Sequence, residues 1–155
     1  MFIKKNLKYQ KLPLPHKISM SDFEMMSSIK NFKDYMLKRH TVRDFSKRSV
    51  DFEIIQNAIQ IAGSAPSGAN HQPWHFVAIS NKDIKKTIRE AAEIEEKKFY
   101  SGGASDEWIK ALEPIGTNAN KPHLEIAPWL IIIFAERFGT FDDGTKYKNY
   151  YVPES

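Results

Sequence analysis

Apolar residues recur at helical spacing in three stretches of the chain, which predicts three amphipathic helices. These helices are expected at about residues 21–39, 51–62 and 80–100. Glycine tolerates the backbone that ends a helix, so Gly63 and the pair Gly102-Gly103 are expected to end the second and third of them. The predicted inward faces carry Met25, Ile29, Phe32 and Met36, then Ile55, Ala58, Ile59 and Ala62, and finally Ile84, Ile88 and Ala91.

Two further stretches are predicted to be strands, and a short helix is expected between them at 106–112. Residues 75–80 alternate weakly, whereas residues 128–134 are apolar at successive positions. Because successive side chains of a strand point to opposite faces, the second stretch is expected to be a central strand covered on both sides. Helices outnumber strands and separate them, which predicts an α+β or α/β fold with few strands.

Composition narrows the class of protein. The 155 residues, 41% of them hydrophobic and 12% aromatic, suffice for one folded domain and exclude a disordered polyampholyte. The longest apolar run, 127–135, is far shorter than the roughly 20 residues that span a bilayer, so a soluble, cytoplasmic protein with no membrane partner is expected. Residues 1–20 carry prolines and no clear period, which predicts an extended arm. The absence of cysteine excludes disulfides, thiolate catalysis and cysteine-ligated zinc.

The net charge of +4 favours anionic ligands in general, but the charges are dispersed along the chain. A nucleic-acid-binding surface would need a continuous basic stripe with interleaved aromatic residues, so no nucleic-acid partner is expected. The basic start carries Lys4, Lys5, Lys8 and Lys11, and an acidic helix face carries Glu90, Glu93, Glu95 and Glu96.

Two segments are candidates for a ligand site. The first, Arg39-His40-Thr41-Val42-Arg43, would point Arg39, Thr41 and Arg43 to one side if extended, where they could bind a phosphate or the polar edge of a ring. Taken alone, two arginines that meet the negative end of a helix dipole are the more common arrangement. The second segment, 64–74, joins a helix to a strand through small residues. It is either an ordinary loop or a bend in which Ser67 and Gly68 offer a hydroxyl and close-lying N–H groups to a planar ligand.

A third candidate comprises Glu96, Tyr100 and Lys121. Glu96 and Tyr100 lie four residues apart on a predicted helix and share a face, which is usually only a solvated surface. Together with an ammonium group, they would complement an amino acid, whose own ammonium would bind Glu96 and whose carboxylate would bind Lys121. The spacing by itself does not bring Lys121 to the helix.

Other polar clusters have simpler explanations. His71 and His75 are separated by Pro73 and have no carboxylate in the motif, which favours hydrogen-bonded loop or strand-end histidines over a metal site. Asp142-Asp143-Gly144 is typical of a turn, because the later ligand positions of a calcium loop are wrong.

In combination, these residues resemble the nitroreductase superfamily and, within it, the iodotyrosine deiodinase branch. The resemblance runs from about residue 35 to the last residue with nearly constant spacing. It is carried by Arg39-His40-Thr41-Val42-Arg43-Asp44-Phe45-Ser46, Ala65-Pro66-Ser67-Gly68-Ala69, Gln72-Pro73-Trp74, Glu95-Glu96, Tyr100, Trp108, Thr117-Asn118, Lys121 and Ala127-Pro128-Trp129-Leu130-Ile131.

The resemblance implies an FMN-dependent oxidoreductase that removes halogen from halotyrosines, works as a homodimer and has NAD(P)H as a candidate reductant. It implies an α+β nitroreductase-like FMN-binding fold with helices around a small mixed sheet. Residues 21–155 would be the N-terminal portion of that domain, incomplete at the C-terminus, where the family supplies further FMN contacts and much of its dimer interface. The implied FMN ligands are Arg39, His40, Thr41, Arg43, Ser67 and Gly68, and the implied substrate ligands are Ala69, Glu96, Tyr100 and Lys121.

The sequence is also compatible with two alternative functions. An FMN-dependent nitro- or quinone reductase would accept flat aromatic substrates without using the amino-acid end, and would depend little on Glu96 or Lys121. An inactive or partner-requiring fragment would neither bind FMN nor turn over alone. His40 departs from the arginine that is common in the family, and a neutral histidine would weaken charge pairing with a phosphate.

Overall fold

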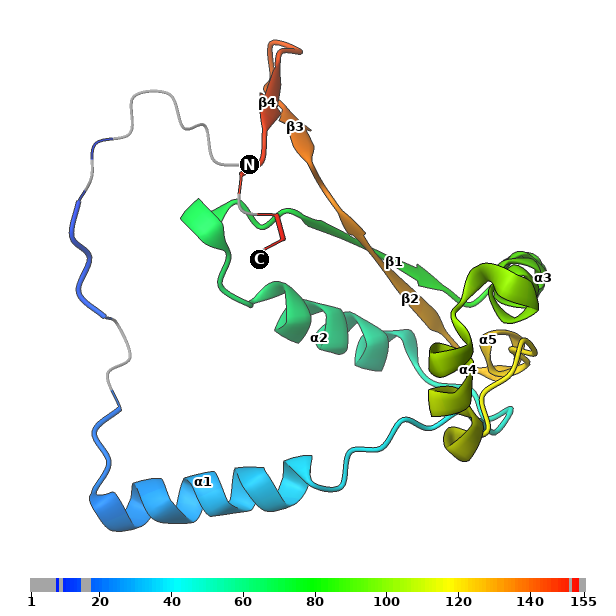
Figure 1. Cartoon of the computed structure of the whole chain (residues 1–155). Coiled ribbons are helices and arrows are strands. Elements are labelled where there is room, and N and C mark those ends of the chain that lie inside the picture. The colour runs from blue at the N-terminus through cyan, green and yellow to red at the C-terminus, as the bar shows by residue number, and fades with distance from the viewer. Residues whose placement is uncertain (1–7, 9, 15–17, 151, 154–155) are drawn as a thin grey trace. The chain divides into compact units, whose positions relative to one another are not determined.

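The computed structural model describes residue 8 and residues 10–14, 18–150 and 152–153 (Figure 1). It divides into two units, residues 1–42 and 43–155. Much of the predicted arm at 1–20 lies outside the described residues, and the described part of it has no regular secondary structure. Among the described residues, no helix is both long enough and apolar enough to cross a membrane.

The first unit contains one helix, α1 (Asp22–Met36), in its described part. The hydroxyl of Ser21 accepts a hydrogen bond from the Glu24 N–H, and the Glu24 carboxylate accepts one from the Ser21 N–H at 2.8 Å. This reciprocal capping fixes the start of the helix and lowers the pKa of Glu24. The helix ends three residues before the predicted Arg39, and it has no buried residue. The predicted inward face is therefore exposed in this structure.

The second unit begins with α2 (Phe52–Gly63), which lies beside strand β1 (Trp74–Ile79) (Figure 1). Asp51 caps the helix by accepting a hydrogen bond from the Glu53 N–H at 2.8 Å. The predicted bounds of this helix are confirmed within one or two residues. Its start is tied to the sheet, because the ring of Phe52 packs at 5.6 Å from that of Trp129.

Strand β1 pairs antiparallel with β2 (Leu130–Ala135), with Trp74 opposite Ala135 and Ile79 opposite Leu130. A second antiparallel pair, β3 (Phe138–Thr140) and β4 (Lys146–Lys148), is joined by a turn. In that turn Asp143 accepts hydrogen bonds from Thr145, which lower the pKa of Asp143 and confirm the predicted turn at 142–144.

The α+β class is confirmed, but two expectations about the strands are wrong. Both sheets of the described part are antiparallel pairs rather than a mixed sheet. The stretch predicted as a central, doubly covered strand pairs only with β1 in the described part, and its Ile133 is 61% exposed. An apolar run shows that a strand can be covered on both faces, but the described elements cover only one face of β2.

The remaining helices gather at the far end of β1 (Figure 1). The longest is α3 (Lys82–Lys98), the last is α5 (His123–Ile126), and a helical turn follows the end of α3. Of the three predicted inward positions, Ile84 and Ala91 are exposed and Ile88 is half-buried, which corrects the expected orientation of α3. The covered side carries Lys85 and Arg89 instead, because α3 packs against α5 through paired polar groups. The bounds are α3 (Lys82–Lys98), a π-helical turn (Phe99–Gly103), α4 (Asp106–Leu112), a 3₁₀ turn (Glu113–Ile115) and α5 (His123–Ile126).

Candidate active site

A pocket of about 320 Å³ opens between the end of α3, α4 and the loop before α5. We call it the clamp pocket. Its polar side combines both signs of charge with two hydroxyls, and its apolar side is largely aromatic. The polar lining residues are Arg43, Glu96, Tyr100, Thr117 and Lys121, and the apolar ones are Phe99, Trp108 and Leu112.

An ion pair crosses the clamp pocket from the helix to the loop. The Lys121 Nζ lies 2.9 Å from the Glu96 Oε2, and the two side chains are 16% and 35% exposed. The same ammonium donates a hydrogen bond to the Asn118 carbonyl at 2.8 Å. The fold thus brings Lys121 to the helix, which the spacing of the sequence could not establish.

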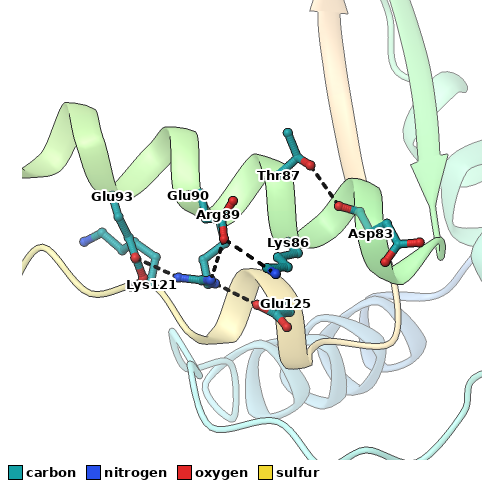
Figure 2. A network of polar contacts seen from close by, with 8 residues as sticks. All are labelled: Asp83, Lys86, Thr87, Arg89, Glu90, Glu93, Lys121 and Glu125. Atoms are coloured by element: carbon teal, nitrogen blue, oxygen red, sulfur yellow. Dashed lines mark hydrogen bonds and ion pairs between the residues drawn. The ribbon is translucent and has the colours of Figure 1, made fainter.

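A network of charged side chains holds the Lys121 backbone in place (Figure 2). The Lys121 N–H donates to the Glu93 Oε1 at 2.8 Å, and this bond is the main reason that the pKa of Glu93 is lowered. Arg89 donates to Glu93 at 2.8 Å and to Glu125 of α5 at 2.7 Å, and the bond to Glu125 is the main reason that the pKa of Arg89 is raised. The loop before α5 is therefore attached to α3 at several points.

Tyr100 lies just beyond the end of α3, in the π-helical turn. Its hydroxyl donates to the Thr117 Oγ1 at 3.0 Å, and Phe99 packs edge-on against both Tyr100 and Trp108. Gly102 has φ 123, and a Cβ on Gly103 would lie 2.9 Å from the Lys98 carbonyl oxygen. The glycine pair is thus required by the backbone that ends the helix, as predicted.

Positive charge gathers on one side of the clamp pocket. The pKa of His123 is lowered by burial of its ring and then by the nearby positive charges of Arg43 and Lys121. The two cations of the pocket, Arg43 and Lys121, thus act on the same neighbour, and positive charge of this kind favours an anionic group of a ligand.

The small-residue bend supplies mainly backbone groups. Ala69, Asn70 and Gln72 all have positive φ, at 51°, 51° and 47°. Asparagine tolerates the left-handed backbone conformation that a positive φ implies, but alanine and glutamine adopt this conformation at a cost of about 1–3 kcal/mol each. The hydroxyl of Ser67 accepts a hydrogen bond from the Gln72 N–H at 2.8 Å, which closes the bend. Strain of this kind is concentrated at ligand sites.

The structure brings some predicted residues together and separates others. Arg43, Glu96, Tyr100 and Lys121 line the same pocket. The bend with Ser67, Gly68 and Ala69 precedes β1, whereas the helices around the clamp pocket lie at the other end of that strand (Figure 1). Within one chain, the bend and the clamp pocket are therefore separate. Arg39, His40 and Thr41 belong to the first unit, where they lie in irregular, exposed chain.

Several residues that line or support the clamp pocket were not among the predicted ligands. Thr117 positions the Tyr100 hydroxyl, Glu93 holds the Lys121 backbone, and the Asn118 carbonyl holds the Lys121 ammonium. The spacing of Glu93 and Glu96, three residues apart, puts both on one side of a helix and could have indicated Glu93. No local pattern reveals the loop carbonyl of Asn118.

Of the two histidines near β1, His71 is hydrogen-bonded as predicted, whereas His75 only lies near a carboxylate. The His71 Nδ1 lies 2.9 Å from the Asn149 Oδ1, and the His75 Nδ1 lies 3.7 Å from the Glu136 Oε1. Within the part of the chain that the structure describes, no group of three or more histidine and acidic side chains could hold a metal ion.

Comparison with known proteins decides the family. The model of the nitroreductase family matches residues 36–152. This chain belongs to the nitroreductase family. The predicted resemblance is thereby confirmed, and the motifs that carry it fall within the matched range.

The curated relatives include iodotyrosine deiodinases of a bacterium and an animal. The protein of Haliscomenobacter hydrossis is 48% identical over 132 residues, which are 85% of this chain and 60% of the relative. The protein of Nematostella vectensis is 40% identical over 128 residues, which are 83% of this chain and 48% of the relative. The chain thus spans between about half and three fifths of the length of these relatives.

A solved structure of the same kind is similar in fold. Oxidized iodotyrosine deiodinase bound to FMN and 3-iodo-L-tyrosine matches with a TM-score of 0.64 and 34% sequence identity. The match covers 68% of this chain and 56% of the other. The described elements therefore form part of the fold on which that protein holds its flavin and substrate.

Proposed function

We propose that this chain takes part in the FMN-dependent reductive dehalogenation of halotyrosines. The observation that carries the proposal is the Glu96–Lys121 ion pair across the clamp pocket, beside an aromatic wall. An amino acid carries an ammonium and a carboxylate on one carbon, so it needs a carboxylate and an ammonium from the protein in close proximity. A flat aromatic substrate without those groups would have no use for them.

The clamp pocket would bind the amino-acid end by exchanging partners. The substrate ammonium would replace Lys121 as the partner of Glu96, and the substrate carboxylate would pair with Lys121. Each new contact is charge-assisted and includes a hydrogen bond, so neither protein charge is left unpaired in a half-buried site. Tyr100 is already oriented by Thr117 and would complete the enclosure.

Residues that could hold FMN are present and have unused hydrogen-bonding capacity. The side chains of Arg39, His40, Thr41 and Arg43 are all exposed. None of them makes a hydrogen bond or ion pair with a described residue of the unit to which it belongs. Guanidinium groups fit a phosphate or the oxygen-rich edge of a flavin, and the narrow bend at Ser67 can approach a flat ring closely. The donor set therefore fits the cofactor.

When bound and reduced, FMN would supply the electrons. Replacing a carbon–iodine bond by a carbon–hydrogen bond consumes two electrons and one proton and releases iodide. The protein would hold the halogenated ring near the cofactor by fixing the amino-acid end, which makes the reaction effectively intramolecular. NAD(P)H as the source of those electrons stays a prediction.

The separation of the bend from the clamp pocket supports a homodimer. In one chain the bend precedes β1, whereas the helices around the clamp pocket gather at the other end of that strand (Figure 1), so the two regions form separate parts of the chain. In a two-fold dimer, any contact between one region of the first copy and another region of the second copy occurs twice. The bend of each copy can therefore meet the clamp pocket of the other copy. The active site we propose is accordingly shared between two chains.

The proposed function is tested with FMN-loaded protein under anaerobic conditions. With dithionite as reductant, 3-iodotyrosine should yield tyrosine and iodide, and the Glu96→Gln variant should lose most of this activity at low substrate concentration. Reduction of a nitroaromatic compound by the same preparation serves as the control reaction. If Glu96→Gln leaves deiodination unchanged while nitro reduction is efficient, the protein is a general nitro- or quinone reductase instead.

A further inference from the structure

A second and larger cavity lies at the start of α3, whereas the clamp pocket lies at its end. It measures about 670 Å³ and is lined by the end of β1, the start of α3, the segment after α5 and the segment before α2. We call it the basic pocket. It shares no lining residue with the clamp pocket, and none of the predicted FMN or substrate ligands lines it.

The buried ammonium of Lys85 is the central feature of the basic pocket. Lys85 is only 4% exposed, and its Nζ donates to the Ala127 carbonyl at 2.6 Å. An ammonium group has three N–H donors, and within the described residues Lys85 makes this one hydrogen bond and no ion pair. A buried charge without a counterion is unfavourable, so this cavity wall favours an anion.

The remaining polar lining strengthens that preference. Lys47 and Lys82 add two further cations, and Ser49 and Ser80 add hydroxyl donors. The single acidic group of the lining is Glu125, whose Oε2 accepts a hydrogen bond from the Arg89 Nε at 2.7 Å. Because Arg89 balances Glu125, the cavity presents a net positive charge and has no unpaired carboxylate that would attract a ligand ammonium.

The other wall is apolar and includes a fixed aromatic ring. Trp129 donates its indole N–H to the Val50 carbonyl at 2.8 Å and packs against Phe52, so its orientation is set from two sides. Ile126 and Pro128 extend this wall. A flat apolar body could lie here while its charged end reaches the lysines.

We propose that the basic pocket binds a small aromatic anion, an aryl phosphate or aryl carboxylate, with Lys85 contacting the charged group and Trp129 flanking the ring. The cavity size lies within the range usual for small-molecule sites. The ligand differs in kind from a halotyrosine, because this pocket offers cations without a partner carboxylate. The site is thus separate from the proposed active site and does not depend on it.

The indole N–H resonance of Trp129 provides a direct test. The chain contains three tryptophans, so a Trp129→Phe variant assigns the signal. Phenyl phosphate is titrated into FMN-saturated protein, which keeps the flavin site filled, with phenol and inorganic phosphate as separate controls. The proposal predicts a saturable shift of the Trp129 signal with phenyl phosphate, and at least about tenfold weaker binding of each control compound.

Variants identify the cations involved. Lys82→Gln should weaken phenyl phosphate binding several-fold and Lys85→Met about tenfold or more, whereas Lys86→Gln, on the same helix but outside the lining, should not change it. Lys82→Gln keeps the test valid if Lys85→Met fails to fold. No saturable shift, equal binding of phenol, or wild-type affinity in Lys82→Gln would overturn the proposal. Deiodination is not part of the readout, so the proposed function is tested independently.

Discussion

The clamp pocket and the small-residue bend supply ligand-binding groups in different ways. At the clamp pocket, charged side chains from α3 and from the loop before α5 pair with one another, and a network around Arg89 fixes their backbone. At the bend, the backbone itself is the specialised part, with positive φ at Ala69 and Asn70 and a hydroxyl that closes the turn.

This difference shows which kind of change each region should tolerate. The clamp pocket depends on charge, so conservative neutral substitutions should impair binding while the fold persists. The bend depends on conformation, so a change in side-chain shape should affect stability even where no charge is altered.

The largest effect is expected at Lys121. Lys121→Ala removes a charge-assisted contact worth about 1.5–3 kcal/mol, so the Kd of 3-iodotyrosine should rise roughly ten- to a hundredfold. Isothermal titration calorimetry on FMN-loaded protein measures this change. Lys98→Ala is the matched control, because Lys98 is 66% exposed and pairs with Glu95 on the solvent side. Equal effects of the two substitutions would contradict the assignment of the clamp.

The next effect should appear at the bend as a loss of stability. Ala69→Val places a β-branched side chain at φ 51, which should lower the free energy of unfolding by about 1–2 kcal/mol. Urea denaturation provides the measurement. Ala104→Val is the control, because Ala104 has φ −113 and ψ 155, which suit valine. If both variants are equally stable, the backbone of the bend is not strained.

A smaller effect concerns the titration of His123. Burial and the charges of Arg43 and Lys121 lower its pKa, so the folded state resists protonation. The free energy of unfolding should therefore decrease as the pH is lowered from 6.5, the ordinary pKa of histidine, through the lower pKa of His123 in the folded state. Arg43→Gln should raise the pKa of His123 without restoring it fully, since burial remains. NMR titration of the imidazole tests this, and Arg43→Lys, which keeps the charge, should leave the pKa nearly unchanged.

The smallest effect is expected at Glu95, the neighbour of Glu96. Its ion pair with Lys98 is exposed, so Glu95→Gln should change stability by less than about 1 kcal/mol and leave the Kd of 3-iodotyrosine within twofold. The same measurements on Glu96→Gln should show a clear loss of affinity. A comparable loss in Glu95→Gln would show that general acidity of the helix, rather than one placed carboxylate, attracts the substrate.

Local structure was largely predictable from the sequence because local signals determine it. The apolar period and Gly63 indicated the extent of α2, the glycine pair indicated the end of α3, and Asp142-Asp143-Gly144 indicated a turn. The helix predicted at 106–112 has those bounds in the structure. Caps and turns act within a few residues, so their sequence patterns are sufficient.

Long-range arrangement was less predictable. The predicted orientation of α3 was wrong because Arg89 and Glu93 face the protein, where they bind Glu125 of α5 and the Lys121 backbone of the preceding loop. The spacing of apolar residues does not indicate such polar partners. The same holds for Lys121, whose position beside Glu96 depends on that packing. The apolar run of β2 indicated the capacity to be covered on both faces, but not which elements would cover it.

The shared active site is the central claim, and complementation between variant chains tests it most directly. Lys121→Ala and Ala69→Trp chains are coexpressed with different affinity tags, and the heterodimer is isolated through both tags. The assay is run with 3-iodotyrosine well below the Kd of the Lys121→Ala variant, where each parent variant should have little activity. A site shared between copies leaves one of two sites intact, so the heterodimer should have about half of the wild-type deiodinase activity. An inactive heterodimer, or failure of the two chains to copurify, would contradict the claim.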